Sequence, residues 1–348
     1  MAEYMVSQIH PQDRHGQAQV DALLTQEGIR RDGNLDYTCG IYDDAYNLIA
    51  TGSCFANTLR CMAVSHHHQG LGLMNLIVSH LLEQQVFRGN GHVFLYTKCD
   101  SAKFFGDLGF YEIVRIEGQI VFMENRRNGF ASYLQRLSAQ KKDGNTIAAI
   151  VMNANPFTLG HQYLVEHMAK QADLVHLFMV SEDSSLVPFS VRKQLILAGT
   201  THLSNVYCHE SGPYIISNAT FPSYFQKDED SVIESHAQLD LAVFLQIAKA
   251  LDITVRYVGH EPSSVVTGIY NQVMQSALPA HGIGCQIIPR MEQNGAPISA
   301  STVRTAIKCS DWDALKALVP PTTYAYFTSP ESAPVVQRIQ SQADVVHY

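Results

Sequence analysis

The stretch TIAAIVMNANPFTLGHQYLVEHMAKQA, residues 146–172, decides the fold of the second half of this chain. It begins with the apolar run TIAAIVM, which is typical of a buried strand, and ends with GHQYLVEHMAKQA, whose apolar residues recur at helical spacing. Between them, NANPFTLGH contains Pro156 and Gly160, which are turn-forming residue types. A buried strand that turns directly into an amphipathic helix is typical of a parallel sheet covered by helices.

The sequence downstream repeats this alternation. The runs LVHLFMV, NVYCHE, TVRYVGH and CQIIPRM read as strands, and VIESHAQLDLAVFLQIAKAL is one of the helical segments between them. We therefore predict an α/β fold in which a doubly wound, Rossmann-like parallel sheet occupies residues 146–348.

The sequence upstream has a different pattern. TCGIYDDAYNLIATGSCF predicts a hairpin that turns at Asp43-Asp44, and LRCMAV predicts a strand that leads through a glycine loop into a helix. Residues 124–145 are polar and basic and end on the turn-forming Asp143-Gly144-Asn145. We predict a mixed α/β domain over residues 1–125, a connecting helix or linker over 126–145, and the parallel-sheet domain over 146–348.

Composition excludes several classes of function. Twenty-four Lys and Arg against 32 Asp and Glu give a formal charge of −8, which predicts no nucleic-acid or anionic-membrane partner. Seven scattered cysteines without a C-x-x-C pair favour reduced thiols in a cytoplasmic protein. The N-terminus lacks the pattern of a signal peptide, and no apolar run approaches the roughly 20 residues of a membrane span. The run His66-His67-His68 lacks carboxylate or cysteine neighbours at suitable spacing, so we predict no metal site there.

Two segments have the residue types of a phosphate site. NPFTLGH lies where a strand meets a helix N-terminus, and free amides and the helix dipole favour phosphate at such a position. ISASTVRTAIK, residues 298–308, begins a second helix with Ser299 as its N-cap, hydroxyls in the first turn and Arg304 one turn further. Taken singly, each segment also fits a turn or a capped surface helix without a ligand.

Together the two segments resemble the (H/T)-x-G-H and I-S-x-S-x-x-R signatures of the nucleotidylyltransferase superfamily. The resemblance implies that ATP is attacked at its α-phosphate with release of pyrophosphate. It implies catalytic roles for His161 at the α-phosphate, for Thr158 where many members have another histidine, and for Arg304 at the β and γ phosphates. The other residues that it assigns to the nucleotide are Asn155, Pro156, Phe157, Gly160, Arg192, Gly259, Glu261, Ser299, Ser301 and Thr302.

The first domain resembles a different family, the GNAT acyltransferases. His67-His68-Gln69-Gly70-Leu71-Gly72 is similar to their (Q/R)-x-x-G-x-(G/A) loop, with His67 at the position of Gln or Arg. The resemblance implies that amides around Gly70 and Gly72 bind the pyrophosphate of a coenzyme A-like group at a helix N-terminus.

The pairing of these two domains resembles the citrate lyase ligase family over nearly the whole chain. That resemblance implies an AMP-forming acid–thiol ligase that uses ATP and Mg²⁺. Acetate would be activated as acetyl-AMP and transferred to the thiol of a dephospho-CoA-like group on the acyl carrier subunit of citrate lyase. Two alternatives stay open: adenylylation of phosphopantetheine or nicotinamide mononucleotide, and ATP-independent acetyl transfer from, or sensing of, acyl-CoA.

Overall fold

The computed structural model describes residues 4–215, 221, 229–260, 265–293 and 295–342. The described residues form two compact units, the first from residues 1–133 and 221–242 and the second from 134–220 and 243–348. Helix α4 (Gly129–Ser138) and helix α7 (Glu229–Leu251) each contribute to both units. The first half of α7 joins the first unit, where Ser235 donates a hydrogen bond to Gln119 over 3.0 Å. The sequence did not indicate that the chain returns to the first unit after residue 220. The predicted domain limits stay a prediction.

The first unit contains a mixed sheet of seven strands in the order β1-β2-β3-β4-β5-β7-β6. The strands are β1 (Val6–Gln8), β2 (Tyr37–Tyr42), β3 (Leu48–Phe55), β4 (Thr58–Val64), β5 (Phe94–Thr97), β6 (Tyr111–Ile116) and β7 (Ile120–Glu124). All neighbours pair antiparallel except β4 and β5, which pair in parallel. The predicted hairpin is confirmed, because β2 and β3 pair around a turn that begins at Asp43.

The helices α1 (Arg14–Gln26), α2 (Leu73–Phe87) and α3 (Ala102–Asp107) lie wholly within this unit, together with short 3₁₀ turns such as η1 (His66–His68). Leu73, Ile77 and Leu81 form the buried stripe of α2, as expected from their helical spacing. They share one hydrophobic core with Ala102 and Phe105 of α3, so both helices pack on the same part of the sheet.

The second unit is built on a five-stranded parallel sheet in the order β10-β9-β8-β11-β12. The strands are β8 (Ile147–Met152), β9 (Leu174–Met179), β10 (Val206–Glu210), β11 (Val255–Gly259) and β12 (Gly284–Ile288). The chain first builds outward from β8 to β9 and β10, and then crosses β8 to add β11 and β12 on the other side. This reversal makes the carboxyl ends of β8 and β11 the topological switch point of the sheet.

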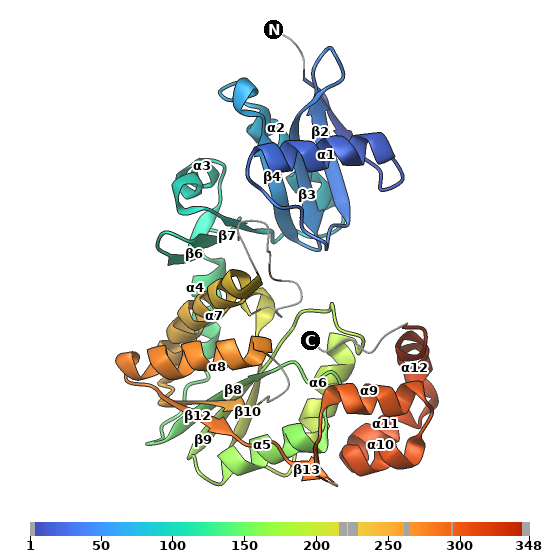
Figure 1. Ribbon diagram of the computed structural model, residues 1–348. Coiled ribbons are helices and arrows are strands. Elements are labelled where there is room, and N and C mark those ends of the chain that lie inside the picture. Colours follow the sequence, from blue (N-terminus) through green and yellow to red (C-terminus); the bar gives the residue numbers. More distant parts are fainter. Residues whose placement is uncertain (1–3, 216–220, 222–228, 261–264, 294, 343–348) are drawn as a thin grey trace. The chain divides into compact units, whose positions relative to one another are not determined.

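Helices cover both faces of this sheet (Figure 1). One face packs on α5 (Leu159–Ala169), α6 (Phe189–Thr200) and the C-terminal helices. These are α9 (Ala300–Lys308), α10 (Trp312–Leu318), α11 (Pro321–Phe327) and α12 (Ala333–Gln340). The other face packs on α7 and α8 (Val265–Ala277): Arg256 of β11 lies under the ring of Phe244 and donates to the Tyr270 hydroxyl. The predicted fold class is confirmed.

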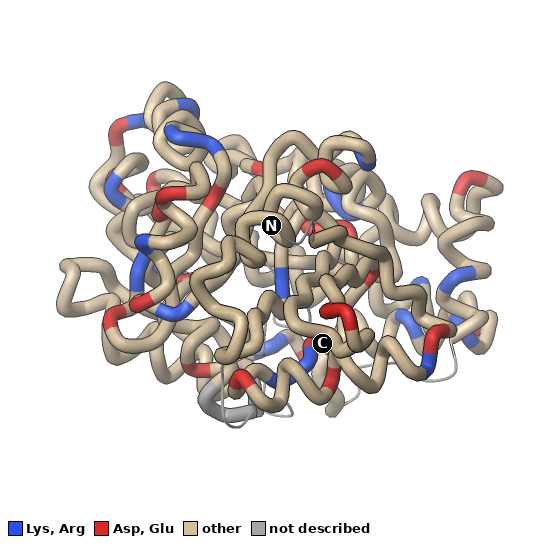
Figure 2. Tube along the Cα trace, turned by 90° about the horizontal axis from the view of Figure 1, so that it is seen from above, with Lys and Arg blue, Asp and Glu red and all other residues tan. Residues whose placement is uncertain are grey.

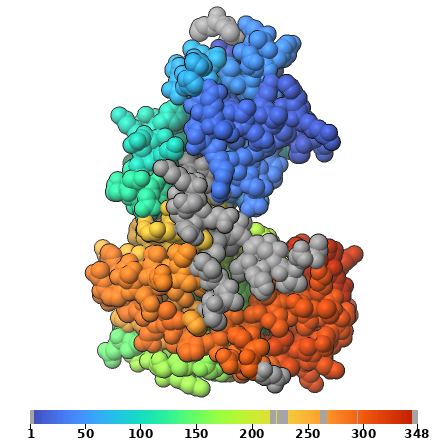
Figure 3. Space-filling model, viewed as in Figure 1, coloured from blue at the N-terminus to red at the C-terminus, as the bar shows by residue number. Residues whose placement is uncertain are grey.

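Neither sign of charge is confined to one segment of the chain (Figure 2). Acidic and basic residues are interspersed along the chain (Figure 2). On the face shown in Figure 3, helices of the C-terminal part (orange to red) form much of the surface of the second unit. No helix among the described residues is both long and apolar enough to cross a membrane. All seven cysteines are free thiols, and burial raises the pKa of the Cys61 thiol to about 12.

Candidate active site

The switch point opens because β8 and β11 pair over only part of their length. β8 is in register with β9 from Ile147 to Met152, whereas its register with β11 covers only Ala148 and Ala149. The two strands therefore stop pairing before their carboxyl ends, where an open α/β sheet binds its ligand. The NANPFTLGH turn follows β8 at this position.

The first turn of α5 is closed by a reciprocal cap. The Thr158 hydroxyl accepts a hydrogen bond from the amide of His161 over 3.2 Å, and Nδ1 of His161 accepts one from the amide of Thr158 over 3.1 Å. Thr158 is buried, and the His161 ring stacks on Phe157 with centroids 5.8 Å apart. These contacts hold the imidazole at the helix N-terminus in one orientation.

The same contacts define the protonation of His161. Because an amide N–H can only donate, Nδ1 must carry a lone pair, and the proton of the neutral ring lies on Nε2. Burial, reinforced by the positive charge of Arg290, lowers the pKa of His161 to about 4. His161 is therefore a neutral imidazole near pH 7 that can donate one hydrogen bond through Nε2.

Gly160 brings the two sequence motifs into backbone contact. A Cβ at this position would lie 3.0 Å from the carbonyl oxygen of Ile298, which is the first residue of the second motif. The glycine therefore permits the close approach of α5 to the segment that leads into α9. The predicted approach of a phosphate to this backbone stays a prediction.

The second motif forms the N-terminus of α9 as expected. The Ser299 side chain accepts from the amide of Thr302 over 3.0 Å, which confirms it as the N-cap. Arg304 is buried, and it donates to the carbonyl oxygen of Asn155 over 2.6 Å and to the Ser301 hydroxyl over 3.2 Å. The guanidinium thus joins the second motif to the turn after β8.

Arg290 is a cation of this site that the motifs did not identify. Its Nε donates to the carbonyl of His260 over 3.0 Å, and its Nη1 donates to the carbonyl of Ile298 over 3.4 Å. The short hairpin of β13 (Glu292–Gln293) and β14 (Ala296–Pro297) returns the chain from Arg290 to Ile298. A basic residue near the end of the predicted strand CQIIPRM was the available signal, and Arg290 lies two residues after β12 ends.

Three residues predicted to contact the nucleotide have buried side chains. Asn155, Pro156 and Phe157 are all buried, and the Phe157 ring packs so closely on Gly199 that a Cβ there would lie 2.4 Å from it. Phe157 therefore acts on the site through its stacking on His161. A direct contact of these side chains with the nucleotide stays a prediction.

Arg192 is also bonded within the protein. It is 1% exposed, and it donates to the carbonyl oxygens of Val187, Asn153 and Val180, among others. These contacts connect the ends of β8 and β9, and they support a role in holding the loops of the site.

Two predicted residues lie near β11. Gly259 ends this strand, and its carbonyl accepts a hydrogen bond from Asn271 of α8 over 3.2 Å. Glu261 lies outside the described residues. The predicted adenine and ribose contacts of both stay predictions.

The glycine loop of the first unit begins α2. Gly70 and Gly72 have φ of +80° and +74°, a left-handed conformation that favours glycine. Gly72 is the N-cap of α2 and contributes no side chain, and the first turn contains no acidic residue. β4 and β5 are in register only at Thr58 and Leu59, so they stop pairing before the end of β4 that leads into this loop. The arrangement leaves helix amides available to an anion.

Comparison with known proteins identifies the family. Residues 147–327 match the model of the citrate lyase ligase C-terminal domain. A [citrate [pro-3S]-lyase] ligase from Klebsiella pneumoniae is 39% identical over 319 residues, which cover 90% of this chain and 93% of that protein. The chain belongs to the citrate lyase ligase family.

Two other members of the citrate lyase ligase family are also similar to this chain over most of its length. The [citrate [pro-3S]-lyase] ligase of Haemophilus influenzae is 36% identical, with 88% of this chain and 93% of that protein covered. The one from Escherichia coli is 39% identical, with 80% and 81% covered. The family resemblance predicted from the sequence is confirmed.

Several solved structures are similar to about a third of this family member. A GNAT family N-acetyltransferase from Escherichia coli in complex with CoA covers 37% of this chain and 84% of that one, with 16% identity and a TM-score of 0.30. The ribosomal-protein-S18-alanine N-acetyltransferase from Escherichia coli covers 35% and 92%, with 15% identity and a TM-score of 0.28.

Proposed function

We propose that this chain activates acetate with ATP and ligates the acetyl group to a thiol on the acyl carrier subunit of citrate lyase. The relatives named [citrate [pro-3S]-lyase] ligase support the enzyme class. The observation that carries the proposal is the joining of the two motifs, in which Arg304 bonds the carbonyl of Asn155 across 149 residues. It places two helix N-termini, a neutral histidine and cationic donors at one switch point, a set suited to a triphosphate.

The first step is adenylation. A carboxylate oxygen of acetate attacks the α-phosphorus, the bond from that phosphorus to the bridging oxygen breaks, and pyrophosphate leaves. His161 donates through Nε2 to an oxygen of the α-phosphate, where negative charge grows. Arg304 and the first-turn amides of α9 stabilise the departing phosphates, assisted by Arg290.

The second step forms the thioester. The thiolate of the prosthetic group attacks the carbonyl carbon of acetyl-AMP, and AMP leaves. We assign the binding of the CoA-like arm to the loop of Gly70 and Gly72, whose helix N-terminus suits a pyrophosphate.

Mg²⁺ belongs to this proposal only through the nucleotide. The described residues contain no group of three His, Cys, Asp or Glu side chains placed to hold a metal ion. We propose that Mg²⁺ would accompany ATP and would supply positive charge to its phosphates, as is usual in phosphoryl chemistry.

Exchange of labelled pyrophosphate into ATP tests the proposal. We expect exchange that depends on acetate and does not occur with nicotinamide mononucleotide or phosphopantetheine. His161→Ala and Arg304→Ala should abolish it, whereas His167→Ala, on the same helix as His161, should leave it unchanged. Exchange with a phosphorylated cosubstrate, or acetyl transfer from acetyl-CoA without ATP, would show that the chain has another function.

A further inference from the structure

The turn after β8 contains a polar side chain that neither motif includes. Asn153 follows the strand directly and is partly exposed. Its Oδ1 accepts a hydrogen bond from Nη1 of Arg192 over 2.8 Å, and its Nδ2 donates to the hydroxyl of Ser185 over 3.1 Å. Ser185 lies in the loop after β9 and is also partly exposed.

Arg192 determines which way this amide faces. A guanidinium can only donate hydrogen bonds, so the atom of Asn153 that faces it must be the oxygen. The amide NH₂ group is consequently directed to the other side, toward Ser185. One of its two hydrogens reaches Ser185, and the second is a donor beside the Ser185 hydroxyl, whose own hydrogen makes only a long contact, over 3.4 Å, with Oδ1 of the same amide.

The positive charge next to this pair belongs to Arg192. Arg192 is 1% exposed and donates to carbonyl oxygens and to Asn153, and no ion pair involves it within the described part of the chain. Its positive charge therefore reaches the Asn153 amide without a bound counter-ion. Asp183 and Glu182 of the same loop both act electrostatically on Arg192, and the Asp183 carboxylate also accepts from the amide of Phe189 over 2.6 Å at the start of α6.

The position of the pair suits the attacking acid. The proposed nucleotide contacts lie at α5, α9 and the β11 side of β8, whereas Asn153 and Ser185 join the ends of β8 and β9. An acid held there reaches the α-phosphate from the side of the sheet that the nucleotide leaves open.

We infer that Asn153 and Ser185 form the subsite that binds the carboxylate of the acid substrate, with Arg192 as the positioning residue that orients the Asn153 amide. This inference rests on the proposed function, since it names the place of the acid in that reaction. Two neutral donors hold the carboxylate through hydrogen bonds without the tight ion pair that would weaken it as a nucleophile.

Steady-state pyrophosphate exchange on the full-length protein tests the subsite. Asn153→Asp replaces the amide by a nearly isosteric carboxylate that still accepts from Arg192 but repels the substrate. We expect it to raise the KM for acetate at least about tenfold and to leave the KM for ATP within about twofold. Ser185→Ala should raise the KM for acetate about threefold, whereas Ser184→Ala, its exposed neighbour, should change neither constant.

Arg192→Lys tests the positioning role, because lysine keeps the charge but loses the planar fork. It should raise the KM for acetate more than it lowers kcat. An unchanged KM for acetate in both Asn153→Asp and Ser185→Ala, or an equal rise in the KM for ATP, would overturn the inference. Should Asn153→Asp fail to fold, Ser185→Asp supplies the same repulsion from the partner residue. Absence of acetate-dependent exchange in the wild type would instead contradict the proposed function.

Discussion

His161 should remain uncharged throughout the physiological pH range. Burial and the charge of Arg290 lower its pKa to about 4, compared with an ordinary value of 6.5. This lowering of the pKa corresponds to about 3 kcal/mol against protonation of the folded protein. At pH 6 the ring should therefore be about 1% charged, whereas an unperturbed histidine would be about three-quarters charged. Since the folded chain binds fewer protons than the unfolded chain between pH 6.5 and 4, this group lowers stability as the pH falls through that window.

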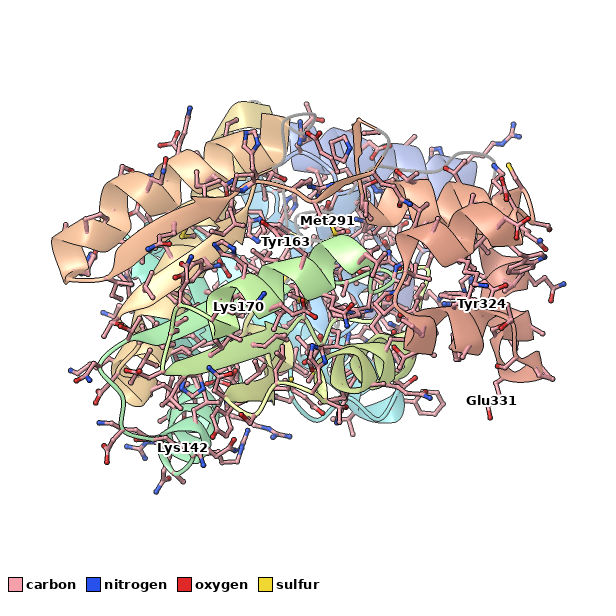
Figure 4. The ribbon with its side chains drawn as sticks, turned by 90° about the horizontal axis from the view of Figure 1, so that it is seen from below. Lys142, Tyr163, Lys170, Met291, Tyr324 and Glu331 are labelled. Carbon is pink, nitrogen blue, oxygen red and sulfur yellow. The ribbon has the colours of Figure 1, made fainter. Side chains whose placement is uncertain are left out.

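NMR of histidine-labelled protein measures this pKa independently of activity. The signal that disappears in His161→Gln should keep a constant Cε1 shift from pH 8 to pH 5 and report a proton on Nε2. Arg290→Gln should raise the pKa of His161 but leave it below 6.5, because burial is the larger cause. Lys170→Gln removes a charge from the far end of α5 and should leave the pKa of His161 unchanged. Figure 4 shows Lys170 and Tyr163 on this helix. An inflection of the His161 signal between pH 6 and 7 would refute the reasoning.

Three further predictions concern other parts of the molecule. Gly160→Ala places a methyl group 3.0 Å from the carbonyl of Ile298 and should lower acetate-dependent exchange about tenfold, with a fall in Tm of a few degrees, by separating the two motifs. His176 and His209 are buried, their ring nitrogens lie 2.9 Å apart, and burial lowers both pKa values to about 4, so stability should fall with pH between 6.5 and 4. In His209→Phe, the stability lost between pH 7 and pH 5, measured by urea unfolding, should be smaller than in the wild type by about 2 kcal/mol. Gly72→Val forces a branched residue into φ of +74°. It should lower the rate of acetylation at limiting carrier about tenfold and leave pyrophosphate exchange unchanged. Equal effects on both assays would contradict the assignment of the loop.

The parts of the site that were predictable depend on neighbours in the sequence. Ser299 was identified as an N-cap because its hydroxyl serves an amide three residues later in the same turn. The five strands of the second unit were recognised because buried parallel strands are continuous apolar runs. Such signals require only local spacing.

Other residues acquired their roles through distant contacts. Arg192 matched a nucleotide-binding arginine in the resemblance, yet its donors lie on carbonyl oxygens at the ends of β8 and β9. Arg290 had no motif, but the hairpin after β12 brings it to Ile298 and close enough to His161 to influence its pKa. Spacing along the chain does not specify which carbonyl a long side chain will reach.

The sequence by itself determined the alternation of strands and helices in the second unit, the Ser299 cap and the membership of the citrate lyase ligase family, because these follow from periodicity, capping and short motifs. Only the tertiary structure decided that Gly160 packs on Ile298, that Phe157 supports His161, and that Asn153 faces Ser185. The first and the last of these contacts join segments that are far apart in the sequence, and their geometry is set by how the helices pack on the sheet. Short sequence motifs therefore specify which chemical groups the site contains, and the tertiary packing specifies how those groups are oriented.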